Sequence, residues 1–212
     1  MQSTMATPEE RLLMHDISWR TYESLLEDSV GSPGTRLTYD NGTLEIMVVY
    51  IGHEDPNSVL RNIVVTTASE TRQDWFGSGS ITLKRSELLK GCEPDSSFYF
   101  RNAAALRKLR GNRNLDLQID PPPELVIEVD ITRSSLPRFP IFAAIGVAEV
   151  WRYDGERVRF YALETGTYQE VEASIVLPPM TATQATRFLE LSTQLSAPEW
   201  EDAVREWVRA RA

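Results

Sequence analysis

Two short segments of this chain each place a carboxylate against an apolar run. In GCEPDSSFYF (residues 91–100) Asp95 comes just before three aromatic residues, and in PPPELVIEVD (residues 121–130) Glu128 lies inside the run LVIEV. A buried carboxylate without a partner is strongly disfavoured, and two on neighbouring strands repel each other unless a cation lies between them. The sequence therefore predicts a hard-metal site built from Asp95 and Glu128, with Mg²⁺ as the natural occupant and Mn²⁺ as a substitute.

A purely structural interpretation of the two acids stays open. Asp95 would then be a turn residue after Pro94, and Glu128 an exposed residue of an edge strand. We favour the metal site because both acids border short apolar runs.

Hydrophobic periodicity and turn signals predict the elements of one domain over residues 18–212, after a loose polar tail over residues 1–17. The expected helices cover residues 18–28, 56–75, 136–145, 183–192 and 198–209, and the expected strands cover 35–40, 43–49, 80–83, 97–101, 124–130, 149–153, 157–163 and 168–171. Ser18 is the expected cap of the first helix, Asn41-Gly42 the expected hairpin turn, and Gly146 the expected end of the third helix. This order predicts an α/β fold in which helices flank a central mixed sheet.

The charge balance restricts the kinds of nucleic-acid contact that the chain can make. A net charge of −9 and a pI near 4.9 argue against a protein that coats nucleic acid nonspecifically. They do not exclude a nuclease, because a metal site needs acids and a basic patch can be local. One run of cations contains no acid: Arg101, Arg107, Lys108, Arg110 and Arg113. It could contact phosphate or be a solvated helix face.

Other residue patterns narrow the chemistry and the compartment. Cys92 is the only cysteine, which excludes an internal disulfide and suits a reducing cytoplasm, and with two histidines a structural zinc site is implausible. We expect no signal peptide and no membrane partner, since no apolar run approaches the roughly 20 residues that span a bilayer. The chain has no phosphate-cradling glycine loop, no H-E-x-x-H motif and no nucleophile elbow.

The same acidic segments carry a family resemblance. "EPD … ELVIEVD" resembles the Pro-Asp … (Asp/Glu)-x-Lys signature of the restriction-endonuclease-like nuclease superfamily. More closely, the chain is similar to a bacterial family described as "putative restriction endonucleases", with further matches at LTYDNGTLEIM…HE (37–54) and FPIFAAIGVAEVWRYDG (139–155). The resemblance covers about residues 18–191. It implies a mixed sheet between helices and a metal-dependent endonuclease that hydrolyses DNA phosphodiester bonds, with the Val129 carbonyl as a third metal ligand.

One position departs from the superfamily pattern, because Asp130 stands where a catalytic lysine is expected. Asp130 could be a third carboxylate ligand, or it could cap the chain leaving the strand with help from Thr132 and Ser134. Arg138 lies eight positions before Gly146, where the resembled family often has lysine, and is the best candidate substitute. Lys84 is the second candidate. An arginine in this role could stabilise charge but could not act as a base, because it stays protonated.

His53 and Glu45 are further candidates for the site. His53 follows a predicted strand that carries Glu45, so the histidine could lie near the metal or the leaving group and Glu45 could be a metal ligand. A lone histidine is more often incidental to function.

The leading hypothesis is thus a cytoplasmic, Mg²⁺-dependent DNA endonuclease, with a homodimer left open. The alternative is a catalytically silent nuclease-fold protein that acts as a nucleic-acid-binding or protein-interaction module, which Asp130 and the acidic pI support. A third hypothesis is a metal hydrolase acting on a non-nucleic phosphate ester.

Overall fold

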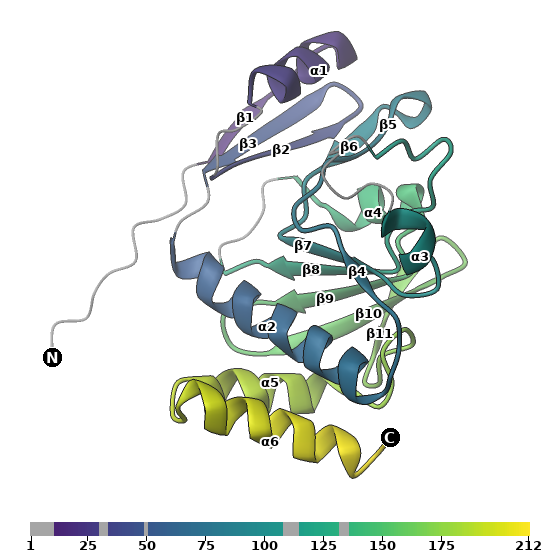
Figure 1. Ribbon diagram of the computed structural model, residues 1–212. Coiled ribbons are helices and arrows are strands. Elements are labelled where there is room, and N and C mark those ends of the chain that lie inside the picture. Colours follow the sequence, from purple (N-terminus) through teal and green to yellow (C-terminus); the bar gives the residue numbers. More distant parts are fainter. Residues whose placement is uncertain (1–10, 30–33, 49–50, 108–114, 132–135) are drawn as a thin grey trace, which may run out of the picture.

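The strands of this protein form two sheets, one above the other (Figure 1). The computed structural model describes residues 11–29, 34–48, 51–107, 115–131 and 136–212, and the side chains of residues 51–54 lie outside this description. The smaller sheet has the order β1-β3-β2-β6-β5 and the larger one β11-β10-β9-β8-β7-β4. The α/β class is confirmed, but the single sheet expected from the sequence is in fact two, because the hairpin at residues 35–48 pairs with β1 and β6 and not with the central strands.

The elements have the following bounds. The smaller sheet contains β1 (Arg11–Met14), β2 (Thr35–Asp40), β3 (Thr43–Val48), β5 (Leu83–Arg85) and β6 (Lys90–Cys92). The larger sheet contains β4 (Phe76–Gly77), β7 (Ser96–Tyr99), β8 (Leu125–Val129), β9 (Glu149–Tyr153), β10 (Val158–Glu164) and β11 (Thr167–Val171). The helices are α1 (Trp19–Asp28), α2 (Ile51–Glu70), α3 (Ala103–Leu106), α4 (Phe139–Ile145), α5 (Ala182–Ser192) and α6 (Ala197–Arg209), with a 3-10 turn at Ser86–Leu88.

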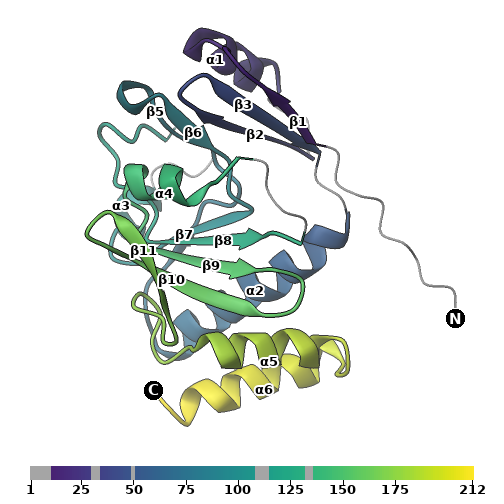
Figure 2. The same cartoon turned by 180° about the vertical axis from the view of Figure 1, so that it is seen from behind.

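Helices cover both faces of the larger sheet (Figures 1 and 2). On one face α2, α5 and α6 pack against Ile127, Trp151 and their neighbours, and on the other face α4 packs against Val126 and Val150. A strand buried on both faces reads as a continuous apolar run, which is why LVIEV in β8 does not alternate. All five residues of β8 are buried, so that Glu128 enters the interior with its apolar neighbours.

The smaller sheet carries α1 on its outer face. The Oγ of Ser18 accepts a hydrogen bond from the Thr21 N–H at 3.1 Å, which confirms the predicted cap. Tyr22 of α1 is fully buried over β6, where an added Cβ on Gly91 would lie 2.3 Å from the tyrosine hydroxyl. Glycine at residue 91 is therefore what allows the helix to approach the sheet so closely.

The sequence misplaced the long helix. It begins at Ile51 rather than at residue 56 and ends at Glu70 rather than at residue 75, with Pro56 inside. Arg72 takes the left-handed conformation (φ 56°), and the N–H of Gln73 bonds back to the Ala68 carbonyl at 2.8 Å, which closes the helix as a glycine would.

The predicted loose tail over residues 1–17 is wrong for part of its length. Arg11–Met14 is the edge strand β1, which pairs antiparallel with β3. Residues 1–10 lie outside the described part of the chain. In the parts that are described, no helix is both long and apolar enough to cross a membrane.

Candidate active site

Asp95 and Glu128 lie side by side at one end of the larger sheet. The antiparallel register pairs Ser96 with Ile127, so Asp95, one residue before, faces Glu128, one residue after. Both side chains are buried, and the Asp95 Oδ2 accepts a hydrogen bond from the Val129 N–H at 2.7 Å. This is the placement on neighbouring strands that the sequence predicts. It also puts the Val129 carbonyl, the third expected ligand, directly after Glu128 on the same strand.

Arg138 brings a positive charge to this pair. It lies at the start of α4, and its Nη1 approaches the Glu128 Oε2 at 2.5 Å. Pro140 in the first turn and Gly146 at the left-handed end (φ 94°) fix the short helix that presents the arginine. The arginine chosen from the sequence as the substitute cation is therefore the one that contacts Glu128.

Burial controls the protonation of both partners. Burial is the largest influence and raises the pKa of Glu128, Arg138 lowers it, and the nearby charge of Asp95 raises it, so that the net pKa is about 7. Burial also lowers the pKa of Arg138, but Glu128 and Asp95 more than offset this, and the pKa of the guanidinium rises. Arg138 thus stays protonated, whereas Glu128 is a carboxylate that a further cation would stabilise in its charged form.

The environment of Glu128 fits a divalent cation. Among the described residues its buried Oε1 has no hydrogen-bond partner, and such a buried oxygen is costly. No group of three or more histidine, cysteine, aspartate or glutamate side chains in the described chain is placed to hold a metal ion. Mg²⁺, however, commonly keeps several waters and uses only one or two protein carboxylates. Asp95 and Glu128 are sufficient for such a site.

Asn57 supports this arrangement from α2. Its Oδ1 accepts a hydrogen bond from the Ser96 Oγ at 2.8 Å, and its Nδ2 donates to the Asp95 carbonyl at 3.4 Å. The amide thereby ties α2 to the start of β7. Asn57 was not among the predicted site residues, although an asparagine close to the apolar stripe of a helix is a recognisable signal of a buried polar contact.

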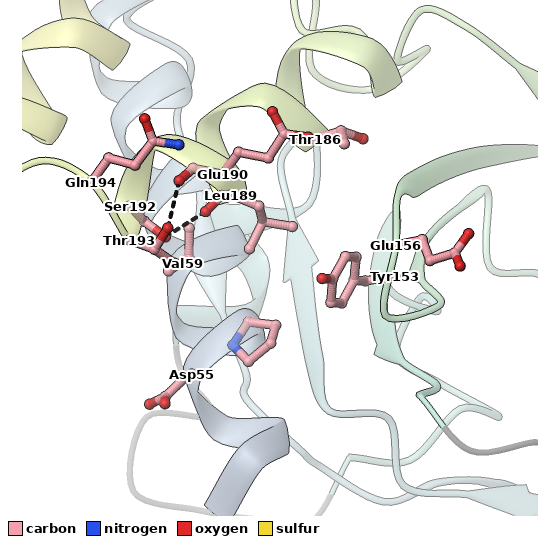
Figure 3. Close-up of a pocket in the computed structure, with 11 residues that line it drawn as sticks. Asp55, Val59, Tyr153, Glu156, Thr186, Leu189, Glu190, Ser192, Thr193 and Gln194 are labelled. Atoms are coloured by element: carbon pink, nitrogen blue, oxygen red, sulfur yellow. Dashed lines mark hydrogen bonds between the residues drawn. The ribbon is translucent and has the colours of Figure 1, made fainter. Parts of the chain in front are cut away.

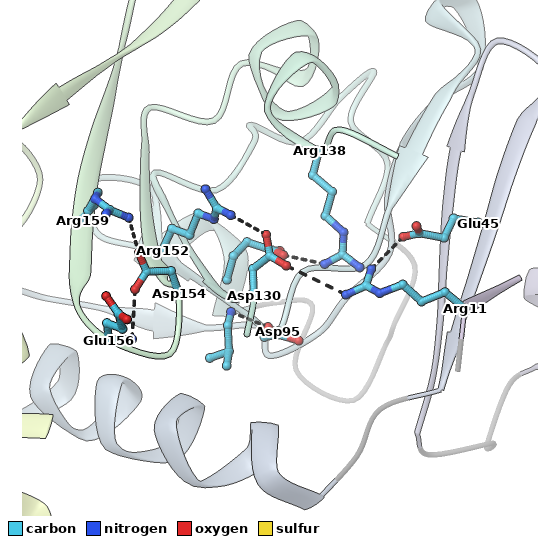
Figure 4. A network of polar contacts seen from close by, with 11 residues as sticks. Arg11, Glu45, Asp95, Asp130, Arg138, Arg152, Asp154, Glu156 and Arg159 are labelled. Carbon is cyan, nitrogen blue, oxygen red and sulfur yellow. Dashed lines mark hydrogen bonds and ion pairs between the residues drawn. The ribbon is translucent and has the colours of Figure 1, made fainter. Parts of the chain in front are cut away.

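A second layer of charges surrounds Asp130 (Figure 4). Its Oδ2 accepts from the Arg152 Nη2 at 2.7 Å, and its Oδ1 lies 4.0 Å from the Arg11 Nη2. The Nη1 of Arg11 also contacts Glu45 at 3.1 Å. Asp130 therefore binds two arginines, neither of which the sequence analysis singled out. The caps expected from Thr132 and Ser134 lie outside the described residues.

Glu45 reaches this layer of charges from the smaller sheet. Its carboxylate contacts Arg11 and accepts the Leu136 N–H at 3.2 Å. In the described chain neither Glu45 nor Asp130 belongs to a group of three or more carboxylate, histidine or cysteine side chains placed to hold a metal ion.

The remaining candidates lie elsewhere. Lys84 on β5 of the smaller sheet contacts Glu23 of α1 at 2.7 Å. Arg101 and Arg107 of the basic run contact Glu124 and Asp74, while Lys108, Arg110 and Arg113 lie outside the described residues. Glu124 is four residues before Glu128, about 13 Å along the strand, so Arg101 lies near the opposite end of β8. The side chain of His53 is not described.

A cleft of about 380 Å³ lies between α2, α5 and the end of β9 (Figure 3). Its lining includes the carboxylates of Asp55, Glu156 and Glu190, beside Tyr153 and Leu189. No lysine or arginine is among its lining residues in the described chain. The cleft does not suit a phosphate, and we place the candidate site at Asp95 and Glu128.

The mixed sheet between helices, with two acids on adjacent strands, defines a restriction-endonuclease-like fold. The chain belongs to the Uma2 family, described as "putative restriction endonuclease", whose family model matches residues 19–198. The matched range contains Asp95, Glu128 and Arg138, and it leaves out Arg11. No curated protein matches the chain.

Proposed function

We propose that this protein is a metal-dependent endonuclease that hydrolyses DNA phosphodiester bonds, with Mg²⁺ held by Asp95 and Glu128. The observation that carries the proposal is the state of Glu128: a buried carboxylate with one oxygen held by Arg138, and the other without a hydrogen-bond partner in the described chain, beside a second buried acid. Membership of a nuclease family supports DNA as the substrate.

The reaction sets clear tasks for the protein. Water adds to phosphorus, the bond from phosphorus to one ester oxygen breaks, and the departing oxygen receives a proton. Bound Mg²⁺ would supply charge neutralisation and a lowered pKa of water. Asp95 and Glu128 would supply the anionic ligands, and the Val129 carbonyl a neutral one. Arg138 fixes the orientation of Glu128, and because it stays protonated its contribution is charge and position rather than proton abstraction.

Plasmid nicking in Mg²⁺ or Mn²⁺ tests the proposal. We expect Asp95→Asn and Glu128→Gln to abolish nicking and Glu164→Gln, an exposed carboxylate on β10, to leave it unchanged. The two disabled variants should keep the far-ultraviolet circular dichroism of the wild type. Nicking that survives both substitutions would refute the site, and a wild type that never nicks DNA in either metal would refute the activity.

A catalytically silent nuclease-fold protein is the second candidate, and one observation favours it. Arg138 already neutralises the Oε2 of Glu128, and an aspartate stands at residue 130 in place of the expected lysine. On this hypothesis the arginine replaces the metal permanently. The same assay separates the two functions, since the silent protein binds DNA in a salt-dependent manner and does not cut it.

A further inference from the structure

A row of charged residues crosses the larger sheet from the Asp95–Glu128 pair outward. In the parallel register of β8 and β9, Glu128 pairs with Arg152, and in the antiparallel register of β9 and β10, Arg152 pairs with Arg159. Paired residues of neighbouring strands point to the same face of a sheet. Asp95, Glu128, Arg152 and Arg159 therefore lie in one line on the face that also carries α4.

The arginines near the site differ in access to solvent. The side chains of Arg138 and Arg11 are only 9% and 10% exposed, and each contacts a buried glutamate. The side chain of Arg152 is 32% exposed and that of Arg159 is 22% exposed. Arg152 and Arg159 can therefore contact a large ligand from solvent without a rearrangement of the interior, whereas Arg138 and Arg11 cannot.

Each exposed arginine is held by one aspartate from the adjoining part of the sheet. Asp130 accepts from the Nη2 of Arg152 at 2.7 Å, and Asp154 accepts from the Nη1 of Arg159 (Figure 4). Among the described residues, these are the only hydrogen bonds made by the two guanidinium groups. A guanidinium has five N–H donors in a rigid plane, so each group keeps several donors for a further partner.

We propose that Arg152 and Arg159 bind successive phosphates of a nucleic-acid strand and that Asp130 and Asp154 are their positioning residues. This inference rests on the proposed function, since it takes nucleic acid as the substrate. It adds where the nucleic-acid strand would run, which is past Arg152 and Arg159 beside Asp95 and Glu128. Arginine suits the role because its planar fork matches two phosphate oxygens at once. The paired aspartates reduce the freedom of the two long side chains before the ligand arrives.

The test is the salt dependence of binding to a fluorescently labelled DNA duplex, measured by anisotropy in EDTA so that no cleavage occurs. Each lost phosphate contact lowers the magnitude of the slope of log K against log salt by about 0.9. We expect this loss in Arg152→Ala and in Arg159→Ala, and about twice this loss in the double variant. Arg152→Lys should keep the slope, and so serves where the alanine variant is poorly folded.

Arg209→Ala is the matched control. Arg209 is an exposed arginine of α6 whose guanidinium contacts Glu70. Helix α6 covers the face of the larger sheet opposite to α4 (Figure 1). Removal of the Arg209 side chain should leave the slope unchanged. If Arg152→Ala and Arg159→Ala behave like Arg209→Ala while the wild type binds, the inference is overturned and the proposed function stands. If the wild type shows no binding to DNA, the nucleic-acid substrate and this inference fall together.

The role of Asp130 has its own readout. Asp130→Asn keeps the charge of Arg152 but weakens its anchor, so binding should persist with an unchanged or steeper slope while the rate of nicking falls. If Asp130 had only a structural role, Asp130→Asn would lower the melting temperature and would reduce DNA binding and the nicking rate together. An Asp130→Asn variant with unaltered nicking would show that Asp130 does not position Arg152 for the reaction.

Discussion

The two ends of the parallel strand pair β8–β9 each hold a buried glutamate, and the two glutamates differ in what surrounds them. At the amino-terminal end of β9, Glu149 accepts hydrogen bonds from the Trp151 Nε1 at 2.5 Å, the Ile175 N–H at 2.7 Å and the Val176 N–H at 3.2 Å. At the carboxyl-terminal end of β8, Glu128 is held by a single arginine through one oxygen.

The pKa of each glutamate is raised, and the causes of the two shifts reflect this difference in surroundings. Burial raises the pKa of Glu149, and the N–H donors around it act against that rise. Burial also raises the pKa of Glu128, and although Arg138 opposes the rise, the charges of Asp95 and Asp130 add to it and bring the pKa to about 7. A carboxylate that joins segments of the fold is thus surrounded by neutral donors. Glu128, by contrast, is surrounded by charged side chains, and its Oε1 has no hydrogen-bond partner among the described residues. Such a carboxylate can accept a further ligand, as is typical of functional sites.

One of the two largest expected effects is a loss of stability at the amino-terminal end of β9. Glu149→Ala removes the acceptor of the buried Trp151 Nε1–H and of the partly buried Ile175 and Val176 N–H groups. A buried donor left without a partner costs about 1–3 kcal/mol and a partly buried one less, so we expect the free energy of unfolding to fall by roughly 3–5 kcal/mol. Urea denaturation measures it, with Glu164→Ala as the exposed control. A loss below about 1 kcal/mol would show that Glu149 does not join these segments.

At the carboxyl-terminal end we expect the charged pair, and not either residue alone, to determine stability. Arg138→Met leaves a buried carboxylate without its partner and should cost roughly 3–5 kcal/mol, whereas Glu128→Leu combined with Arg138→Met should restore stability to within about 1 kcal/mol of the wild type. The same denaturation experiment compares them. If the double variant is as unstable as the single one, the Glu128–Arg138 contact is not the coupled pair described here.

The smallest expected effect is a pH dependence from Glu149. Because its pKa is raised in the folded protein, folding favours its protonated form. The stability from this group is present below the unfolded pKa of about 4.3 and is lost as the pH rises through the folded pKa. Relative to Glu149→Gln, which does not titrate, the wild type should therefore lose stability as the pH rises over this range. If the difference in free energy of unfolding between the wild type and Glu149→Gln is the same at every pH, the raised pKa of Glu149 is contradicted.

Local signals in the sequence predicted the elements that carry the site. The apolar run LVIEV with one acid placed Glu128 on a buried strand, and Pro94-Asp95 placed the second acid at the start of its neighbour. The Asn41-Gly42 turn, the Ser18 cap and the stop at Gly146 each depend on a single residue type with a specific backbone preference, and the structure has all three.

The parts that escaped prediction depend on contacts between distant segments. Arg11 and Arg152 reach Asp130 from β1 and β9, and no local pattern distinguishes them from other surface arginines. The division into two sheets depends on which strands pair, which periodicity does not specify. The end of α2 was missed because an arginine, Arg72, takes the left-handed position in which glycine is the usual signal.

Titration with Mn²⁺, followed by the loss of its free-ion paramagnetic resonance signal, tests the central claim most directly. We expect the wild type to bind Mn²⁺, Mg²⁺ to displace it, and Asp95→Asn or Glu128→Gln to abolish binding, while Glu164→Gln binds as the wild type does. Unbound Mn²⁺ in the presence of the wild type, or equal binding by the Asp95→Asn and Glu128→Gln variants, would contradict a metal site at the carboxyl-terminal end of β8.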